Sequence, residues 1–391
     1  MVYRILSLDG GGTWALIQVL ALIKIYDENT KGHRVLADFD MAAANSGGAI
    51  VLGALLEDLT LGQIRDYFLH IRQRQSLFHD GGTLFDKALN EFGIGPKYAT
   101  EPKLAGLKRL MPNMGDKKLA ELKQEFNNRQ RGELRLLIIG FDYDHNRAVF
   151  FRSYETGSDA WGTSAHAGEV TLAEAIHASS TAPVNYFDSP AKLDSTPGRY
   201  WDGGITGQNN PVLAAVVEAV QTKLDPKTIA ALSIGTGTVC LPDAKNPDNP
   251  KVYEMRPEAQ NIPNDLKKLA KSILDDPPDA ASFIAHVITY AQPNGESLSR
   301  IVRMSPMISP QGKPNNWKLP QGITGAQFQA LIDTPMDAMS DGDVGLIRVL
   351  AEAWLDNRFY NQPIRMDHRS WVWELGHDKA SDAIAYWNEI C

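Results

Sequence analysis

One serine in this sequence has the local setting of a nucleophile. Ser46 stands in Ala44-Asn45-Ser46-Gly47-Gly48, between an apolar strand-like run and an apolar helix-like run. A sharp strand-to-helix turn with small neighbours exposes a serine hydroxyl to a reacting carbonyl carbon. Taken alone, Ser-Gly-Gly is more often a plain turn, and a serine hydroxyl is a weak nucleophile without a base. The sequence must therefore supply a base elsewhere.

Asp202 is the candidate for that base. It follows three residues with strand character and precedes two glycines, so we expect its carboxylate at a strand end that faces the same cleft. In isolation, Asp-Gly-Gly is a common turn. The nine histidines offer no obvious catalytic context, since His145 is expected at a turn tip and His177 in the middle of a helix.

Three consecutive glycines, Gly10, Gly11 and Gly12, follow the first apolar run and precede the first helical run. Backbone N–H groups at the positive end of a helix favour a bound anion. A tetrahedral oxyanion and a phosphate would both suit this loop. The plainer interpretation is a tight turn with positive φ, although three glycines exceed what one turn requires.

Alternating strands and helices must position these residues. Apolar runs predict strands at 3–8, 38–44, 134–143 and 229–235, with 147–154 returning as a hairpin partner. Helical periodicity is expected at 16–23, 49–56 and 212–220, and capping-box patterns begin further helices at Thr60 and Thr171. This alternation predicts an α/β fold with a mainly parallel central sheet covered by helices on both faces. The site is then expected at the carboxyl ends of the strands.

The remaining chain is expected to belong to the same domain, so that residues 1–391 form one unit. Residues 241–321 are polar and rich in proline and asparagine, which predicts a loop-rich insertion or cap with one helix near 279–290. Residues 341–391 are expected to form C-terminal helices.

Composition restricts the class of protein. A net charge of −8 argues against a nucleic-acid partner, because such a protein must neutralise phosphates. Two cysteines, Cys240 and Cys391, exclude a disulfide framework and give no metal-ligand spacing. We expect a soluble, cytoplasmic protein, because no apolar run approaches the roughly 20 residues of a transmembrane helix and the N-terminus lacks a signal sequence. Peripheral membrane contact would need a local apolar or basic patch.

Five blocks, in order, resemble the patatin-like phospholipase family. They are Asp9-Gly-Gly-Gly, the turn at Ser46, residues 178–187, Asp202-Gly-Gly with Asn209-Asn-Pro, and residues 233–237. The blocks span roughly residues 1–240, and residues 337–341 are loosely similar to the family's ending. The resemblance implies a three-layer patatin-like α/β fold.

The resemblance also implies a reaction and its residues. Ser46 would be the nucleophile, Asp202 the base, and the backbone of Gly10, Gly11 and Gly12 the oxyanion hole, with no cofactor and no metal. The substrate would be a phospholipid or another fatty-acyl ester, cleaved in the manner of a phospholipase A or lysophospholipase through an acyl-enzyme.

Two positions depart from the family's pattern. Ala44 stands where the family usually has the first glycine of Gly-x-Ser-x-Gly, which a strand conformation tolerates. Trp14 stands where the family usually has a basic residue near the oxyanion. We expect an oxyanion site held by backbone N–H groups alone, which Trp14→Arg would strengthen. The other interpretation is that Trp14 packs at the start of the first helix.

Two alternatives remain open from the residues. An actin-like sugar kinase or ATPase would use residues 8–13 and 234–237 around a nucleotide, but it leaves Ser46 and Asp202 without a purpose. A catalytically weak patatin-fold module that binds lipid would explain Trp14 and Ala44, but the presence of both Ser46 and Asp202 argues against it.

Overall fold

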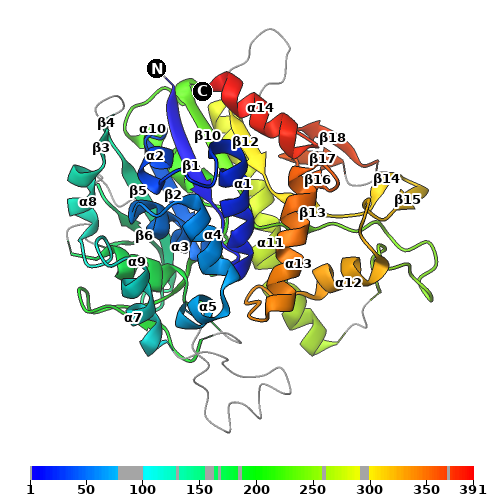
Figure 1. Ribbon diagram of the computed structural model, residues 1–391, viewed down its shortest axis with the longest axis horizontal. Coiled ribbons are helices and arrows are strands. Elements are labelled where there is room, and N and C mark those ends of the chain that lie inside the picture. Colours follow the sequence, from blue (N-terminus) through cyan, green and yellow to red (C-terminus); the bar gives the residue numbers. More distant parts are fainter. Residues whose placement is uncertain are drawn as a thin grey trace.

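The computed structural model describes residues 2–77, 100–128, 132–154, 163–165, 169–183, 187–257, 261–290, 299–367 and 370–391. In this part of the chain, a mixed α/β fold surrounds a nine-stranded central sheet that is largely parallel (Figure 1). The predicted fold class, a mainly parallel sheet flanked by helices, is therefore confirmed.

The strand order of the sheet is β12-β10-β1-β2-β5-β6-β7, with β9 pairing both β5 and β8. From β12 to β5 the strands are parallel, whereas β6 and β9 run antiparallel to β5. The strands are β1 (Tyr3–Leu8), β2 (Met41–Asn45), β5 (Arg135–Asp142), β6 (Arg147–Arg152), β7 (Thr163–Ala165), β8 (Ala191–Lys192), β9 (Arg199–Asp202), β10 (Ile229–Ile234) and β12 (Ile301–Met304).

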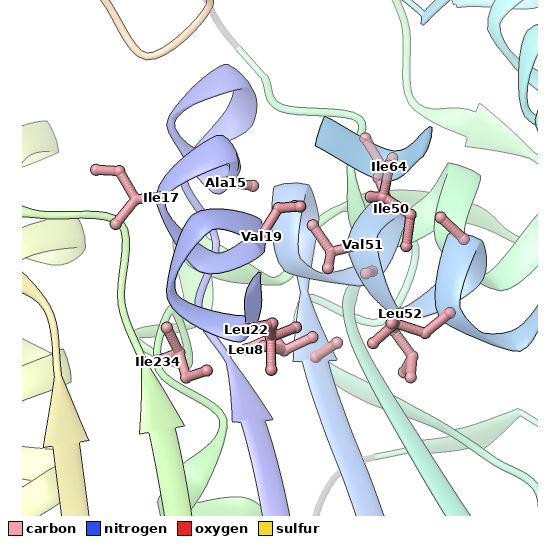
Figure 2. Close-up of a cluster of buried hydrophobic side chains, with 14 of the residues drawn as sticks. Leu8, Ala15, Ile17, Val19, Leu22, Ile50, Val51, Leu52, Ile64 and Ile234 are labelled. Atoms are coloured by element: carbon pink, nitrogen blue, oxygen red, sulfur yellow. The ribbon is translucent and has the colours of Figure 1, made fainter. Parts of the chain in front are cut away.

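Alternate residues of each central strand are buried in two different apolar cores, one on each face of the sheet. Leu6 and Leu8 of β1 belong to the larger core, and Ile5 belongs to the smaller one. This division follows from the two-residue period of a strand, with both faces covered. Figure 2 shows part of the larger core, where side chains of several helices meet those of the strands, including Leu8, Val19, Leu22, Val51 and Ile234.

Helices that contribute to the larger core include α1 (Leu16–Tyr26), α3 (Ser46–Leu56), α4 (Leu61–Leu69), α9 (Leu172–Ser179) and α13 (Asp341–Leu355). Helices α10 (Val212–Gln221) and α11 (Ile262–Thr289) contribute to the smaller core. The other helices are α2 (Gly32–Leu36), α5 (Ile71–Leu77), α7 (Glu101–Leu110), α8 (Leu119–Glu125), α12 (Gly325–Asp333) and α14 (Ala380–Ile390). Short strands outside the central sheet are β3 (Asn127–Asn128), β4 (Gly132–Glu133), β11 (Thr238–Val239), β13 (Pro306–Ile308), β14 (Gln311–Lys313), β15 (Asn316–Lys318), β16 (Tyr360–Asn361), β17 (Arg365–Asp367) and β18 (Val372–Leu375). Among the described residues, no helix is both long enough and apolar enough to cross a membrane.

Local sequence signals explain several helix starts. Thr60 accepts a hydrogen bond from the Gln63 N–H at 3.1 Å, and the Gln63 side chain accepts from the Thr60 N–H at 2.9 Å. Thr171 and Glu174 form the same reciprocal pair at the start of α9. Each pair satisfies two backbone donors that a helix start leaves free, so both predicted capping boxes are confirmed.

The prediction of a loop-rich segment at 241–321 was wrong for much of its length. Residues 262–289 form α11, which is far longer than the helix expected at 279–290, and residues 301–304 form β12 in the central sheet. The prolines in this segment suggested a break, but burial of Ala281 and Ala285 against the smaller core favours the helix over local propensity. In the C-terminal region, β16, β17 and β18 lie between α13 and α14.

A buried ion pair joins α10 to the sheet. The Arg152 guanidinium of β6 donates to both carboxylate oxygens of Glu218 in α10, at 2.7 and 3.1 Å, and the Tyr154 hydroxyl donates to Glu218 at 3.0 Å. Both charged side chains are at most 4% exposed. A pair buried this deeply tolerates the loss of one partner poorly.

Candidate active site

Ser46 lies at the sharp turn between β2 and α3. β2 ends at Asn45 and α3 begins at Ser46, whose φ is 49°. This left-handed conformation is strained for a residue with a side chain and is typical of a nucleophile elbow. The Ser46 N–H donates to the hydroxyl of Ser179 at 2.9 Å, which helps to hold the turn.

Asp202 lies next to this turn because of the pairing of β5. On β5, Ile139 is the partner of Asn45, and the next residue, Gly140, is the partner of Asp202. β9 therefore runs beside β5 where β2 has ended, and its last residue comes close to the start of α3. The structure thus brings together two side chains that the sequence predicted to share a cleft.

The side chains of Ser46 and Asp202 line the same pocket, and the Ser46 hydroxyl is close enough to affect the pKa of the Asp202 carboxylate. The same carboxylate accepts from the Gly204 N–H at 2.8 Å and from the Asn45 side-chain amide at 3.3 Å. Asp202 is 6% exposed. Burial raises the pKa of the Asp202 carboxyl, while the Ser46 hydroxyl, the two hydrogen bonds from Gly204 and Asn45 and the nearby Lys103 oppose that rise. The result is a buried carboxylate of increased basicity beside a strained serine.

The side chain of Lys103 in α7 is buried close to Asp202. This position was not predicted from sequence. Its ammonium group donates to the Thr181 hydroxyl at 3.2 Å and lies 4.3 Å from the centre of the Phe187 ring. The Thr181 carbonyl oxygen in turn accepts from the Asp202 N–H at 2.8 Å. Burial lowers the pKa of Lys103 well below its usual range, and Asp202 partly opposes this. A single lysine inside an amphipathic helix gives no sequence signal of such a position.

The glycine loop lies against the elbow. A Cβ added to Gly47 would be 2.5 Å from the carbonyl oxygen of Gly12, so this close approach requires glycine. A Cβ on Gly10 would lie 3.0 Å from the Ser46 Cβ. The loop that follows β1 and the turn that follows β2 are therefore neighbours, as expected for the carboxyl ends of adjacent parallel strands.

The amides of the loop are not equivalent. The Gly10 N–H donates to the Asn209 carbonyl oxygen at 2.9 Å, so it is not available to an oxyanion, in contrast to the expectation from sequence. Within the described part of the chain, the N–H groups of Gly11 and Gly12 have no hydrogen-bond acceptor. Only these two amides of the loop can serve an anion without breaking an existing bond.

Trp14 packs into the protein. It lies in the 3₁₀ turn η1 (Gly12–Ala15), is 7% exposed, and its indole N–H donates to the Pro335 carbonyl oxygen at 3.0 Å. Trp14 does not line the pocket around Ser46. These contacts favour the second interpretation of Trp14, in which the side chain packs at the start of the first helix.

The two histidines considered from sequence lie outside the pocket that contains Ser46. His145 is exposed, and its Nδ1 atom lies 2.8 Å from the Asp142 carboxylate. His177 is buried in α9, where burial and the nearby Lys103 lower its pKa to about 3. It is neutral at physiological pH.

A pocket opens around Ser46. Besides the serine and Asp202, it is lined by Gly12, Gly47, Ile50, Ser180, Ala182, Phe187, Met336 and Asp337. Ile50, Ala182 and Phe187 give it an apolar wall, and its volume is about 40 Å³. Residues 184–186, inside one of the five sequence blocks, lie outside the described residues. In the described part, His, Cys, Asp and Glu side chains form no cluster suited to a metal ion.

Sequence reasoning also missed Asn45 as a connecting residue. Its side-chain amide donates to Asp202 and to the side-chain oxygen of Asn209, each at 3.3 Å, and its oxygen accepts from the Ser179 hydroxyl at 3.4 Å. Asn45 therefore links the elbow, β9 and the segment after β9. Its position directly before Ser46 was the one available signal.

Comparisons with known proteins give distant similarities to several solved structures. Among solved structures, it is similar to VipD from Legionella pneumophila, with 10% identity and a TM-score of 0.35, over 89% of this chain and 67% of that one. It is similar to ExoU, solved with SpcU from Pseudomonas aeruginosa, with 13% identity and a TM-score of 0.25, over 46% of this chain and 38% of that one. It is also similar to human GIVD cytosolic phospholipase A2, with 15% identity and a TM-score of 0.24, over 39% of this chain and 22% of that one.

No curated protein sequence matches the chain. The family model for patatin-like phospholipases, however, matches residues 6–216, which is more than half of the chain and includes Ser46, Asp202 and the glycine loop. The chain therefore belongs to the patatin-like phospholipase family.

Proposed function

We propose that this protein is a lipid acyl hydrolase of the phospholipase A or lysophospholipase type, which acts through a dyad of Ser46 and Asp202. Membership of the patatin-like phospholipase family supports hydrolysis of lipid acyl esters in general. The observation that carries the finer proposal is that the strained Ser46 and the buried Asp202 line one pocket, beside two glycine amides that have no acceptor.

Asp202 is the general base in this proposal. As the Ser46 oxygen attacks the ester carbonyl carbon, its proton passes to the nearby Asp202 carboxylate. Burial that raises the pKa of Asp202 makes it a better proton acceptor than an ordinary aspartate. Asn45 and the Gly204 N–H orient the carboxylate, which must be ionised to accept the serine proton.

The N–H groups of Gly11 and Gly12 stabilise the oxyanion that forms on the carbonyl oxygen. They are supplied by a loop that close packing against Gly47 holds rigid, so little reorganisation accompanies the reaction. The protonated Asp202 then returns its proton to the leaving alcohol, and an acyl-enzyme remains on Ser46. A water molecule, deprotonated by Asp202, releases the fatty acid and restores the serine.

The apolar side of the pocket favours a fatty-acyl substrate. Ile50, Ala182 and Phe187 lie close to Ser46 and would contact the chain of the acyl group. No described side chain is required to hold a metal or a cofactor in these steps. Family membership also removes the ground for the sugar-kinase alternative, which assigned no role to Ser46 or Asp202.

Release of fatty acid from a panel of lipids tests the proposal. The panel contains phospholipids, lysophospholipids, galactolipids and triacylglycerols, and the protein is compared with Ser46→Ala and with Ser381→Ala, an exposed serine of α14. We expect release by wild type and Ser381→Ala but not by Ser46→Ala. Equal release by all three proteins, or release from none of the lipids, would reject the proposal.

A further inference from the structure

A second cavity, of about 190 Å³, adjoins the glycine loop. Gly10 and Gly11 line this cavity, whereas Gly12 lines the pocket of Ser46, and Met336 lines both. The second cavity is bounded on another side by residues 236–239, which follow β10. Nothing in the steps proposed for Ser46 uses this space.

Two charged residues line the cavity, Asp9 and Arg303. They form a buried ion pair with 2.6 Å between the Arg303 Nη2 and the Asp9 Oδ2 atoms. Burial raises the pKa of Asp9 to about 6 while Arg303 opposes the rise, so the carboxylate is ionised at neutral pH. The other carboxylate oxygen, Oδ1, is buried and accepts no hydrogen bond in the described part of the chain. A buried carboxylate oxygen without a donor is costly, and a ligand can supply that donor.

Asp9 and Arg303 differ in how many of their hydrogen-bonding atoms remain unused. Arg303 also donates to the Ser233 hydroxyl at 2.9 Å and to the Gln362 side-chain oxygen at 3.0 and 3.2 Å. Its donors are therefore largely used, whereas one oxygen of Asp9 is not. Asp279, which accepts from Gln362, adds a second negative charge nearby and raises the pKa of Asp9 further. The cavity consequently favours a cation over a phosphate or carboxylate.

The rest of the lining favours an organic cation over a metal ion. Trp14, Val239, Ile308, Leu331 and Ile332 form an apolar wall. Hard metal ions prefer several oxygen ligands, whereas an aromatic ring and a carboxylate together suit an ammonium group with carbon substituents. Thr236 and Thr238 also line the cavity, and the Thr236 hydroxyl donates to the Gly10 carbonyl oxygen at 2.7 Å.

We propose that the cavity beside Gly10 and Gly11 binds a small organic ammonium group, with the Asp9 carboxylate as its counter-ion and Trp14 in its wall. The group is either a free amine or the ammonium of a lipid headgroup, since both present the same chemistry. This site does not depend on Ser46 as a nucleophile.

Calorimetric titration of the full-length Ser46→Ala protein tests the proposal without turnover. The probes are ethanolamine and choline, each against a neutral comparison, with 3,3-dimethylbutanol matching the shape of choline. Vesicles of phosphatidylethanolamine and of phosphatidylglycerol distinguish a headgroup from a free amine. We expect saturable binding of at least one ammonium probe and none of 3,3-dimethylbutanol. Binding of the neutral analogue with equal affinity, no binding of any ammonium probe, or equal displacement by Na⁺ or Mg²⁺ would overturn the proposal.

Substitutions in and near the cavity test whether the ammonium probes bind there. Asp9→Asn removes the counter-ion and should weaken binding about tenfold or more, the scale of one charge-assisted hydrogen bond. Thr238→Leu fills part of the cavity without touching the ion pair and should also weaken binding, which guards against misfolding of Asp9→Asn. Asp333→Asn is the matched control, because it removes the same charge from an exposed position between two lining residues. Equal loss in Asp333→Asn, or no loss in Thr238→Leu and Asp9→Asn, would contradict the assignment.

Discussion

The side chains of Ser46 and Asp202 line the same pocket, although Ser46 begins α3 and Asp202 ends β9. The pairing of β5 produces this relationship, because consecutive residues of β5 pair with the residue before Ser46 and with Asp202 itself. A serine and a base held by the central sheet are positioned more rigidly than side chains on long loops.

Asp202→Asn should reduce turnover about 100-fold or more, because an amide cannot accept the serine proton. The fold should persist, since an amide can still receive the hydrogen bonds from Asn45 and Gly204. The measurement is kcat on a soluble ester, with circular dichroism to check the fold. Asp337→Asn, which alters a second carboxylate in the pocket, should reduce kcat by a smaller factor. Near-normal turnover in folded Asp202→Asn would place the base elsewhere.

The pH profile should reflect the raised pKa of Asp202. The reaction needs the ionised carboxylate, so kcat/KM falls as pH falls through that pKa. Because burial raises this pKa, the acidic limb of the profile should lie above about 3.9, which is the ordinary pKa of an aspartate. A profile measured on a soluble ester with a non-ionising leaving group checks this. A limb at or below the ordinary range would mean that the hydrogen bonds to Asp202 outweigh its burial.

Trp14→Arg should lower stability instead of raising the rate, contrary to the expectation drawn from the family's pattern. The substitution removes a packed ring and places a charge where the indole N–H meets Pro335. We expect a loss of about 2 kcal/mol or more in the free energy of unfolding. Trp14→Phe keeps much of the packing and should lose about 1 kcal/mol for the hydrogen bond. Urea denaturation and kcat, measured on the same preparation, distinguish a loss of stability from a gain in rate. An equally stable Trp14→Arg protein with a higher kcat would restore the expectation from sequence.

Glu218→Ala should be strongly destabilising, because it leaves the buried Arg152 without its counter-ion. Removing one partner of such a pair costs about 3–5 kcal/mol. The exposed pair of Arg348 and Glu352 is the matched control, and Glu352→Ala should cost less than about 1 kcal/mol. Denaturation in urea measures both. Similar losses in the two variants would show that the Arg152 pair is not protected from solvent.

Local signals in the sequence predicted the elements around Ser46. Short apolar runs ending in glycine gave β1, β2 and β10, and the paired capping residues gave the starts of α4 and α9. Both kinds of signal depend on neighbours in the chain. α11 and β12 were missed because their stability comes from packing against distant residues, which proline-rich local sequence obscures.

The candidate site shows the same division between local sequence signals and contacts of distant residues. Ser46, Asp202 and the glycine loop stand in motifs, so a resemblance could find them. The use of the Gly10 amide by Asn209, the burial of Lys103 beside Asp202 and the contact between Trp14 and Pro335 all join distant segments. Sequence alone does not predict which residues of such distant segments come into contact.

Labelling by a fluorophosphonate probe tests the central claim most directly, because the probe reacts covalently with an activated serine. Mass spectrometry of the labelled wild-type protein should place the adduct on Ser46. Ser46→Ala should remain unlabelled, and Asp202→Asn should label much more slowly. An adduct on another serine, or labelling of Ser46→Ala to the level of wild type, would contradict the account.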